Sequence, residues 1–451
     1  MNDPASTIVA VATPAGRGGV GCVRLSGAGS AEISLALFDP SQTDRPLMPG
    51  EAPRFGKFLG REGRALDHGY LVMFPPGRSF SGELTVELWT HGSPAVLDEL
   101  VAAAVAAGAV TAGPGEFTYR AVVNGRLDLT RAEAIRDLVE ARTLYQARVA
   151  FAQAEGALSG RLQPLCLELE EWIARGEAAV EFVEESEAHL PDGRLARAID
   201  SAIAQCNKFV AGYRAGRVVR DGARLVLVGR PNVGKSSLFN RLLEDDRAIV
   251  TEVAGTTRDT IEEDLVLDGI PVRLIDTAGL REVRDAVERA GVGRARQALE
   301  QADLVLFVLD GSRDPDALER ETLARVETEE GRWVAVLNKS DLPLRASLNG
   351  TLSVSAETGD GVQALRAELR KKLIGSGPTE HPVVTNGRHA AALEQARGTL
   401  AKAASAVEQG MSEEWVLEDL KQARQELAAV TGEFGVDDLY DRIFSTFCIG
   451  K

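Results

Sequence analysis

This sequence has few cysteines and no long apolar run, the features that mark secreted, metal-binding and membrane proteins. The 451-residue chain has four cysteines, at Cys22, Cys166, Cys206 and Cys448. Their scattered spacing fits neither a zinc site nor a disulfide framework, so we expect reduced thiols and a cytoplasmic location. No apolar run reaches the length of a membrane span; the longest candidate, 100–110, is too short and mostly alanine. The first residues lack the basic-then-apolar pattern of a signal peptide, and we expect no membrane partner.

Basic residues are also fewer than acidic ones. Lysine and arginine total 51 against 67 aspartates and glutamates, which gives a net charge of -16 at pH 7. The average field of such a protein repels phosphate, so a nucleic-acid partner would require a local basic surface or a second protein. Hydrophobic residues make up 44% and charged residues 26%, a composition typical of globular proteins with sizeable cores. The length leaves room for roughly two to four domains.

The most informative stretch is Gly-Arg-Pro-Asn-Val-Gly-Lys-Ser at 229–236, which fits the phosphate-loop pattern. The apolar run 224–229 predicts a buried strand before it, and 237–243 predicts a helix after it. The glycines let successive N–H groups point at phosphate oxygens, and the helix N-terminus adds partial positive charge. Lys235 would reach the β- and γ-phosphates, and the Ser236 hydroxyl would ligate Mg²⁺. A plain glycine turn is the alternative, but the whole motif and both flanks favour the phosphate loop.

Two further motifs predict the groups that sense the γ-phosphate. Gly-Thr-Thr-Arg-Asp at 255–259 precedes a predicted strand, and there Thr257 could give its hydroxyl to Mg²⁺ and its N–H to the γ-phosphate. Asp276 and Gly279 belong to Asp-Thr-Ala-Gly after the next strand. We expect Asp276 to hold Mg²⁺ through water and the Gly279 N–H to contact the γ-phosphate. Such contacts order a loop with GTP and release it after hydrolysis.

Two motifs later in the same region predict the base. Asn-Lys-Ser-Asp at 338–341 follows another predicted strand. The Asp341 carboxylate can only accept hydrogen bonds, and guanine offers it N1–H and an exocyclic amine, whereas adenine offers an acceptor at N1. Ser-Ala-Glu at 355–357 would supply the Ala356 N–H to guanine O6. Five motifs, in the order and at the strand ends that a GTPase requires, predict GTP as the nucleotide.

Catalytic residues are harder to identify than binding residues. Signalling GTPases place a water-orienting Gln right after Asp-x-x-Gly, but Leu280 stands there in this chain. Glu282, two residues on, could hold water or act as a general base, and an ordinary surface glutamate is the simpler interpretation of its spacing. The predicted GTP-binding positions are Asn232, Val233, Gly234, Lys235, Ser236, Ser237, Thr251, Glu252, Val253, Ala254, Gly255, Thr256, Thr257, Asp276, Thr277, Ala278, Gly279, Asn338, Lys339, Asp341, Ser355 and Ala356.

The pattern of predicted elements divides the chain into four segments. Residues 1–120 mix short strands with an alanine-rich helix, which indicates a small α+β domain. Apolar residues at helical spacing mark 121–221 and again 376–451, and strands alternate with helices across 222–375. We therefore expect one helical-bundle domain that is split in sequence by an inserted Ras-like phosphate-loop GTPase domain. Such an insertion requires chain ends that lie close together.

Individual elements follow from the same patterns. The glycine-rich stretch 16–19 could cradle an anion, although a hairpin turn is the commoner use of such a stretch. The acidic stretch 168–187 is interpreted as a solvated helix face, which argues against nucleic-acid binding there. Strands are expected at 8–12, 20–25, 84–88, 225–228, 264–267, 272–275, 304–309, 334–337 and 352–354, and a helix at 98–107.

Further stretches tie the whole chain to one family. They are Thr-Pro-Ala-Gly-Arg-Gly-Gly-Val at 13–20, Pro-Gly-Glu-Phe at 114–117, Asn-Gly-Arg-Leu-Asp-Leu at 124–129, Ala-Glu-Ala at 132–134 and Cys-Ile-Gly-Lys at 448–451. Together with 229–237, 251–259 and 276–282, they make the chain resemble the MnmE (TrmE) family of tRNA-modification GTPases over nearly its full length. The resemblance implies an N-terminal domain similar to folate-binding domains, beside the helical and GTPase domains.

The resemblance also implies an activity and partners. Such proteins hydrolyse GTP and, with the flavin- and NADH-using protein MnmG, modify C5 of the wobble uridine in certain tRNAs, a carboxymethylaminomethyl-type modification. A tetrahydrofolate derivative (5-formyl- or methylene-tetrahydrofolate) carries the one-carbon unit. The N-terminal domain forms a homodimer, so a heterotetramer with MnmG is expected. The GTPase domains meet on activation, and K⁺ replaces the arginine finger by neutralising charge in the transition state.

The resemblance assigns roles to individual residues. Glu282 matches the catalytic glutamate, and Cys448 lies in a tail implicated in the modification reaction, where an inert cysteine is the simpler alternative. Many members have Lys in place of Arg126, which keeps the charge and changes the donor geometry. The implied potassium ligands are Asn232, Thr251, Val253 (through its carbonyl) and Thr256. The implied folate contacts are Arg24, Glu87, Arg126 and Lys451.

Two other classes of function stay open at the level of sequence. A GTPase that assembles ribosomes or another particle would carry similar motifs from 229 to 357; the N-terminal stretch and the Cys448 tail argue against it. A scaffold that holds a nucleotide without turning it over is the second. Membrane iron transport, which also uses K⁺-sensitive GTPase domains, does not fit a sequence without an apparent transmembrane segment.

Overall fold

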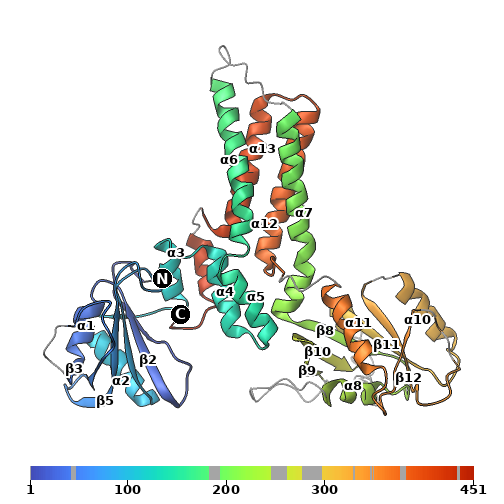
Figure 1. Ribbon diagram of the computed structural model, residues 1–451, viewed down its shortest axis with the longest axis horizontal. Coiled ribbons are helices and arrows are strands. Elements are labelled where there is room, and N and C mark those ends of the chain that lie inside the picture. Colours follow the sequence, from blue (N-terminus) through green and yellow to red (C-terminus); the bar gives the residue numbers. More distant parts are fainter. Residues whose placement is uncertain are drawn as a thin grey trace, which may run out of the picture. The chain divides into compact units, whose positions relative to one another are not determined.

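The chain folds into two compact units, which are drawn in Figure 1. The first comprises Met1–Arg136, Gln153–Leu167 and Arg424–Lys451, and the second comprises Asp137–Ala152 and Glu168–Ala423. No helix among the described residues is long and apolar enough to cross a membrane. The computed structural model describes residues 2–41, 47–181, 193–244, 262–276, 297–328, 331–345, 348, 350–375, 382–433 and 437–450.

A seven-stranded sheet forms the body of the first unit. Its strand order is β3-β4-β5-β6-β2-β1-β7, with β1 parallel to β7 and the other neighbours antiparallel. One face packs under helices α1 (Ser30–Ala36) and α2 (Pro94–Ala106) through a core that includes Val23, Val86 and Leu100. The strands are β1 (Ile8–Val11), β2 (Gly18–Ser26), β3 (Phe38–Pro40), β4 (Arg54–Leu59), β5 (Ala65–Phe74), β6 (Thr85–Gly92) and β7 (Val110–Thr111).

The opposite face of this sheet carries polar and aromatic side chains. Side chains alternate between the two faces along a strand, so Arg24 on β2 and its register partner Glu87 on β6 point away from the core. Trp89 on β6 and its partner Tyr70 on β5 continue the same face. Phe117 of the following helix packs over the β1 end of the face, beside Ile8 and Ala10 in one buried cluster.

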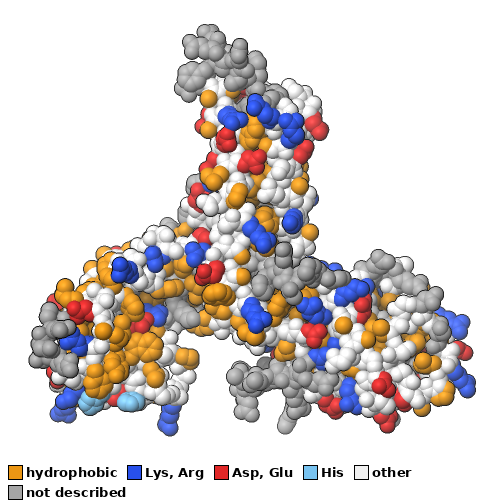
Figure 2. Space-filling model, viewed as in Figure 1, with side chains coloured by type: hydrophobic (Ala, Val, Ile, Leu, Met, Phe, Trp, Pro, Cys, Tyr) orange, Lys and Arg blue, Asp and Glu red, His pale blue; other side chains and the backbone are white. Residues whose placement is uncertain are grey.

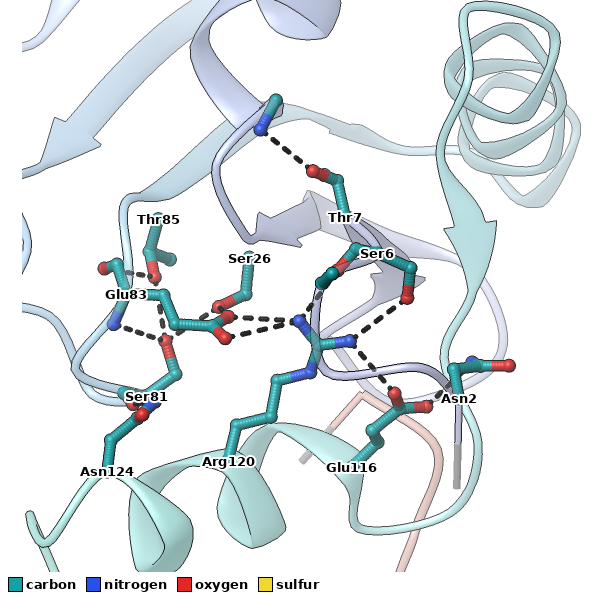
Figure 3. Close-up of polar contacts among 12 residues, drawn as sticks. Asn2, Ser6, Thr7, Ser26, Ser81, Glu83, Thr85, Glu116, Arg120 and Asn124 are labelled. Atoms are coloured by element: carbon teal, nitrogen blue, oxygen red, sulfur yellow. Dashed lines mark hydrogen bonds and ion pairs between the residues drawn. The ribbon is translucent and has the colours of Figure 1, made fainter.

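A buried ionic network holds helix α3 (Glu116–Val123) on the sheet (Figure 3). Arg120 donates to Glu83 Oε2 at 3.1 Å, to Glu116 Oε1 at 3.1 Å and to the Ser6 carbonyl at 2.8 Å. The side chains of Arg120 and Glu116 are only 4% and 1% exposed. The Ser26 hydroxyl donates to the same Glu83 Oε2 at 2.7 Å. One guanidinium therefore joins the N-terminal segment, the β5–β6 connection and α3, and its loss would leave buried carboxylates uncompensated.

A second sheet, of six strands, lies in the second unit. Its order is β13-β12-β11-β8-β10-β9, and all neighbours are parallel except the β9–β10 hairpin. The carboxyl ends of parallel strands meet at one edge, where such sheets bind ligands. The strands are β8 (Ala223–Val228), β9 (Glu262–Leu267), β10 (Ile270–Asp276), β11 (Leu304–Asp310), β12 (Trp333–Asn338) and β13 (Leu352–Ser353), and the helices are α8 (Lys235–Glu244), α10 (Ala317–Thr328) and α11 (Val362–Ile374).

Helices account for most of the remaining described residues. In the second unit α7 packs along α12, the two helices that precede and follow the six-stranded sheet in sequence. Leu393 and Leu400 are fully buried in α12, and so is Leu420 in α13. The helices are α4 (Leu129–Glu140), α5 (Leu144–Ala154), α6 (Ser159–Glu181), α7 (Gly193–Asp221), α12 (Gly387–Glu408), α13 (Glu413–Thr431) and α14 (Asp437–Phe444).

The chain enters and leaves the six-stranded sheet at one place. A Cβ added to Gly216 of α7 would lie 1.9 Å from the Val384 carbonyl oxygen, so only glycine lets these two segments touch. The loop before α5 lies at the same sheet, because the Thr143 hydroxyl donates to the Gly269 carbonyl of the β9–β10 turn at 2.6 Å. The two chain crossings are therefore adjacent, which is the geometry that an inserted domain requires.

The expected fold class is confirmed, and two local expectations need correction. The glycine stretch at 16–19 is not all loop, since Gly18 and Gly19 belong to β2. It connects the antiparallel strands β1 and β2 as a hairpin, which was the commoner of the two uses considered for it. The helix expected at 98–107 begins four residues earlier, at Pro94. Proline suits the first turn of a helix because the N–H that it lacks has no partner there. The spacing of apolar residues could not predict this helix start, because it is determined by a proline.

Candidate functional site

The phosphate loop connects β8 to α8 and requires glycine at two places. Gly229 has a φ of +154°, and a Cβ there would lie 2.3 Å from the Val308 carbonyl oxygen. Gly234 has a φ of +90°, and a Cβ there would lie 2.2 Å from Nδ2 of Asn338. Between them, the exposed Asn232 adopts a left-handed φ of +65°, a conformation that asparagine tolerates better than most residues. The loop backbone is therefore pressed against the ends of β11 and β12.

Ionic and hydroxyl groups gather beside this loop. Lys235 begins α8, and its Nζ donates to the Gly229 and Arg230 carbonyls at 3.0 and 2.8 Å. The Ser236 hydroxyl donates to Asp276 Oδ2, at the end of β10, at 3.1 Å. A hydroxyl and a carboxylate are oxygen ligands of the kind that Mg²⁺ prefers. The predicted Lys235, Ser236 and Asp276 are thus brought together, and they fit a polyphosphate with its metal ion; Ser237 follows in the first turn of α8.

Asn338 joins the phosphate loop to the loop that follows β13. Its side chain is buried at the end of β12, where Nδ2 donates to the Val233 carbonyl at 2.9 Å and Oδ1 accepts from the Ala356 N–H at 3.0 Å. The Ser355 hydroxyl donates to Asp341 Oδ1 at 2.6 Å. Four of the five predicted base-site positions, all but Lys339, are therefore joined by these contacts. Guanine O6 would share the Ala356 N–H with Asn338 Oδ1.

Asp310 is a site residue that the sequence motifs did not reveal. It ends β11 opposite Asn338 in register, and its Oδ2 lies 2.7 Å from Nζ of Lys339, whose φ is +66°. Burial alone raises the pKa of Asp310, but hydrogen bonds from Lys339 and Ser312 outweigh it and hold that pKa below its usual range. The ionised carboxylate anchors Lys339. Its position at a parallel strand end is the signal that could have identified it.

Several predicted site residues lie outside the described residues. They comprise part of the segment that precedes β9, the stretch after Asp276 and the last residue of the chain. Their placement in the nucleotide and folate sites stays a prediction. They are Thr251, Glu252, Val253, Ala254, Gly255, Thr256, Thr257, Thr277, Ala278, Gly279, Glu282 and Lys451.

Two of the predicted folate contacts form an ion pair on the polar face of the first sheet. Arg24 Nε and its NH2 group each lie 2.9 Å from Glu87 Oε1, and the Trp89 indole donates to Glu87 Oε2 at 3.0 Å. The Arg24 guanidinium also lies over the Phe117 ring, 5.7 Å from its centroid. Arg126 lies elsewhere, exposed beside the turn at Gly82. The structure thus joins Arg24 to Glu87 and does not join either to Arg126.

The C-terminal tail packs beside Arg24. Ile449 forms a β-bridge with Pro114, and Gly450 has a φ of +95°. A Cβ on Gly450 would lie 2.1 Å from the Val11 carbonyl oxygen, so the close approach requires glycine. The Gly450 carbonyl accepts from Arg24 NH1 at 3.4 Å. The tail therefore places Gly450 against Arg24, two residues from the exposed Cys448.

A second cysteine on the same sheet face is chemically quiet. Cys22 pairs in register with Trp89 and is 1% exposed. Burial, with the negative charge of Glu87, raises the pKa of the Cys22 thiol to about 12. Because the thiolate is the reactive form of cysteine, Cys22 has a packing role, and the exposed thiol near the pair belongs to Cys448.

An apolar surface adjoins this polar site. Val20, Phe55, Tyr70 and Trp89 are 59%, 44%, 52% and 37% exposed and line a shallow groove on the outer face of the first sheet. Figure 2 shows hydrophobic side chains gathered over this sheet, with histidines at its rim. We call these four residues the apolar strip. Contiguous exposed apolar surface of this kind marks a binding interface more often than a solvated face.

The sequence matches two family models that together span most of the chain. "MnmE helical domain" matches 129–448, and "GTP-binding protein TrmE N-terminus" matches 7–126. Relatives described as tRNA modification GTPase MnmE include one from Aquifex aeolicus, 42% identical over 100% of both chains. One from Azoarcus sp. is 43% identical over 99% of this chain and 98% of its own length. One from Koribacter versatilis is 42% identical over 99% of each.

Replacement of Gly234 by alanine is expected to abolish nucleotide binding. The new Cβ would collide with Asn338 Nδ2 and would sit at an unfavourable φ. We expect the dissociation constant for GDP to rise by about a hundredfold or more, measured by titration of a fluorescent GDP analogue. Gly212→Ala is the matched control, since nothing lies within 4 Å of a Cβ at that α7 position. Similar affinities in both variants would contradict the geometry described here.

Proposed function

The chain belongs to the MnmE (TrmE) family of tRNA modification GTPases, and from that premise we propose a specific activity. It is a potassium-activated GTPase that, with MnmG, modifies C5 of the wobble uridine of certain tRNAs and uses a tetrahydrofolate one-carbon unit. One observation carries the proposal: relatives described as tRNA modification GTPases match this chain from end to end. A match confined to 229–357 would have favoured the particle-assembly alternative.

GTP hydrolysis is assigned to the edge of the six-stranded sheet. When GTP binds, Lys235 leaves the Gly229 and Arg230 carbonyls and contacts the β- and γ-phosphates instead. Asp341 accepts hydrogen bonds from N1–H and from the exocyclic amine of guanine. Ser236 and Thr257 would hold Mg²⁺ directly and Asp276 would hold it through water, and the ion would neutralise charge at the phosphates. Thr257 and Gly279 complete the contacts to the γ-phosphate. The hydrolysed γ-phosphate leaves as inorganic phosphate and GDP remains.

Potassium activation is assigned to the phosphate loop. Asn232 supports this assignment because it is exposed and held at a left-handed φ between two constrained glycines. Thr251, the Val253 carbonyl and Thr256 complete the ligand set, and Glu282 positions the attacking water. A cation against the phosphates favours the transition state as an arginine finger does, because negative charge develops there.

One-carbon chemistry is assigned to the first unit. A reduced pterin presents N–H donors to a carboxylate such as Glu87 and a carbonyl oxygen to the adjacent Arg24, and the anionic glutamate tail of folate suits a separate guanidinium such as that of Arg126. Cys448 is the thiol for the reaction shared with MnmG, because the tail packs beside Arg24. Lys451 approaches the same ligand. The reaction takes place in the cytoplasm.

The apolar strip is assigned to a homodimer of the first unit. Its four residues follow four strands of one sheet face, so a second copy can cover them across a two-fold axis. The strip adjoins Glu87 through Trp89, so the partner copy would border the folate site. Two such protomers and two copies of MnmG form the expected heterotetramer.

Potassium dependence is the first test of the proposed activity. We expect the GTP hydrolysis rate of the full-length protein to rise about tenfold or more in KCl over NaCl at matched ionic strength. Asn232→Ala should lose this increment. GTP affinity measured in the two salts separates binding from hydrolysis. Equal rates in both salts would remove the potassium assignments and favour the assembly-factor class.

Gly450→Ala is expected to uncouple tRNA modification from GTP hydrolysis. The added Cβ displaces the tail from Val11, so the modified uridine formed with MnmG should fall by about tenfold, whereas GTP turnover stays unchanged. Mass analysis of tRNA nucleosides measures the product. Gly398→Ala is the control, because nothing lies within 4 Å of a Cβ at that helical position. Cys448→Ser keeps the tail in place and separates loss of the thiol from loss of its position.

Tyr70→Glu is expected to dissociate the dimer. A carboxylate buried in an apolar interface without a partner costs several kcal/mol, so the dimer dissociation constant should rise by about a hundredfold or more. Sedimentation of the full-length protein measures it. Met48→Glu introduces the same charge at a side chain that is 54% exposed outside the apolar strip. A Tyr70→Glu protein that sediments as the wild type does would rule out the strip as the interface.

A further inference from the structure

Arg241 makes a forked contact between the phosphate-loop helix and the loop after β13. It lies on α8, six residues beyond Lys235. Its Nε donates to the Ala356 carbonyl at 3.0 Å, and its NH2 group donates to the Glu357 carbonyl at 2.6 Å. NH1 contacts Glu244 on the same helix at 3.0 Å, which fixes the plane of the guanidinium. All three nitrogens are therefore engaged, and two of them hold successive carbonyls of one loop.

This fork controls the direction of the backbone N–H groups in the same loop. The Ala356 carbonyl and the Glu357 N–H belong to one peptide plane, so a hydrogen bond that fixes the first also fixes the second. Asn338 Oδ1 holds the Ala356 N–H from the other side. The peptide units on both sides of Ala356 are thus anchored, one by Asn338 and one by Arg241. Arginine suits this task because its donors form a rigid planar fork.

We propose that Arg241 is a positioning residue for guanine recognition. It holds the loop at 355–357, the base loop, in the orientation in which the Ala356 N–H can donate to guanine O6. The proposal rests on the base-reading role proposed for Ala356. Because Arg241 extends from the helix that begins at Lys235, it also ties the base loop to the element that binds phosphate.

Nucleotides that differ at single groups of the base test this role. GTP, 6-thio-GTP and ITP share the phosphates; 6-thio-GTP replaces O6 by sulfur, a weak acceptor, and ITP lacks the amine that Asp341 accepts. We expect the full-length Arg241→Ala protein to bind GTP about tenfold more weakly, since the two hydrogen bonds that orient the base loop are lost. Its preference for GTP over 6-thio-GTP should shrink, whereas its preference for GTP over ITP should stay the same.

Conservative variants and a control keep the result interpretable. Arg241→Lys retains one donor and should recover part of the GTP preference over 6-thio-GTP, and Arg241→Gln should recover less. Arg325→Ala removes an exposed arginine from α10 and should behave as the wild type. Circular dichroism melting of each variant shows whether it is folded at the assay temperature.

The outcomes distinguish the positioning role of Arg241 from the base-reading role of Ala356 on which it rests. Arg241→Ala affinities that fall equally for all three nucleotides would show a general loss of structure and overturn the positioning role. An undiminished preference for GTP over 6-thio-GTP would overturn it as well. Equal wild-type affinity for GTP and 6-thio-GTP would overturn base reading by Ala356 itself, and the role of Arg241 with it.

Discussion

The nucleotide site depends on the buried amide of Asn338. It satisfies a carbonyl of the phosphate loop and an N–H of the base loop, both of which would otherwise be buried unpaired at about 1–3 kcal/mol each. The contact is so close that Gly234 has no room for a Cβ. The phosphate loop and the base loop therefore share one support. Arg241 holds the base loop from a further direction, and Asp310 anchors Lys339, the residue after Asn338.

The first unit also holds its polar site in place through buried interactions, although the site lies on a sheet face and not at strand ends. Its polar site lies on an open sheet face, where the ion pair of Arg24 and Glu87 is bordered by α3, the C-terminal tail and the apolar strip. The Arg120 network holds α3 in place from below the surface (Figure 3). Segments from both ends of the chain thus build one site. An ordered core beneath it keeps the exposed groups in register.

Linear motifs pointed to residues that the structure brings together, because the sheet gathers them. Residues such as Lys235, Asp276 and Asn338 stand at strand ends, and parallel strands bring those ends to one edge. Arg241 escaped prediction because its partners lie more than a hundred positions away and are carbonyls, which every residue type carries. The exposure of the apolar strip was not predicted either. Period-two alternation distinguishes the two faces of a sheet but does not say which face other elements cover.

The contact of Gly216 with Val384 sets the spacing of the two connections to the six-stranded sheet. The segment that leads into the sheet and the segment that leads out of it touch there through their backbones. A side chain at 216 would push the Val384 carbonyl away from α7 and widen the distance between the two connections. The absence of one methyl group thus decides how closely the two ends of this part of the chain can approach.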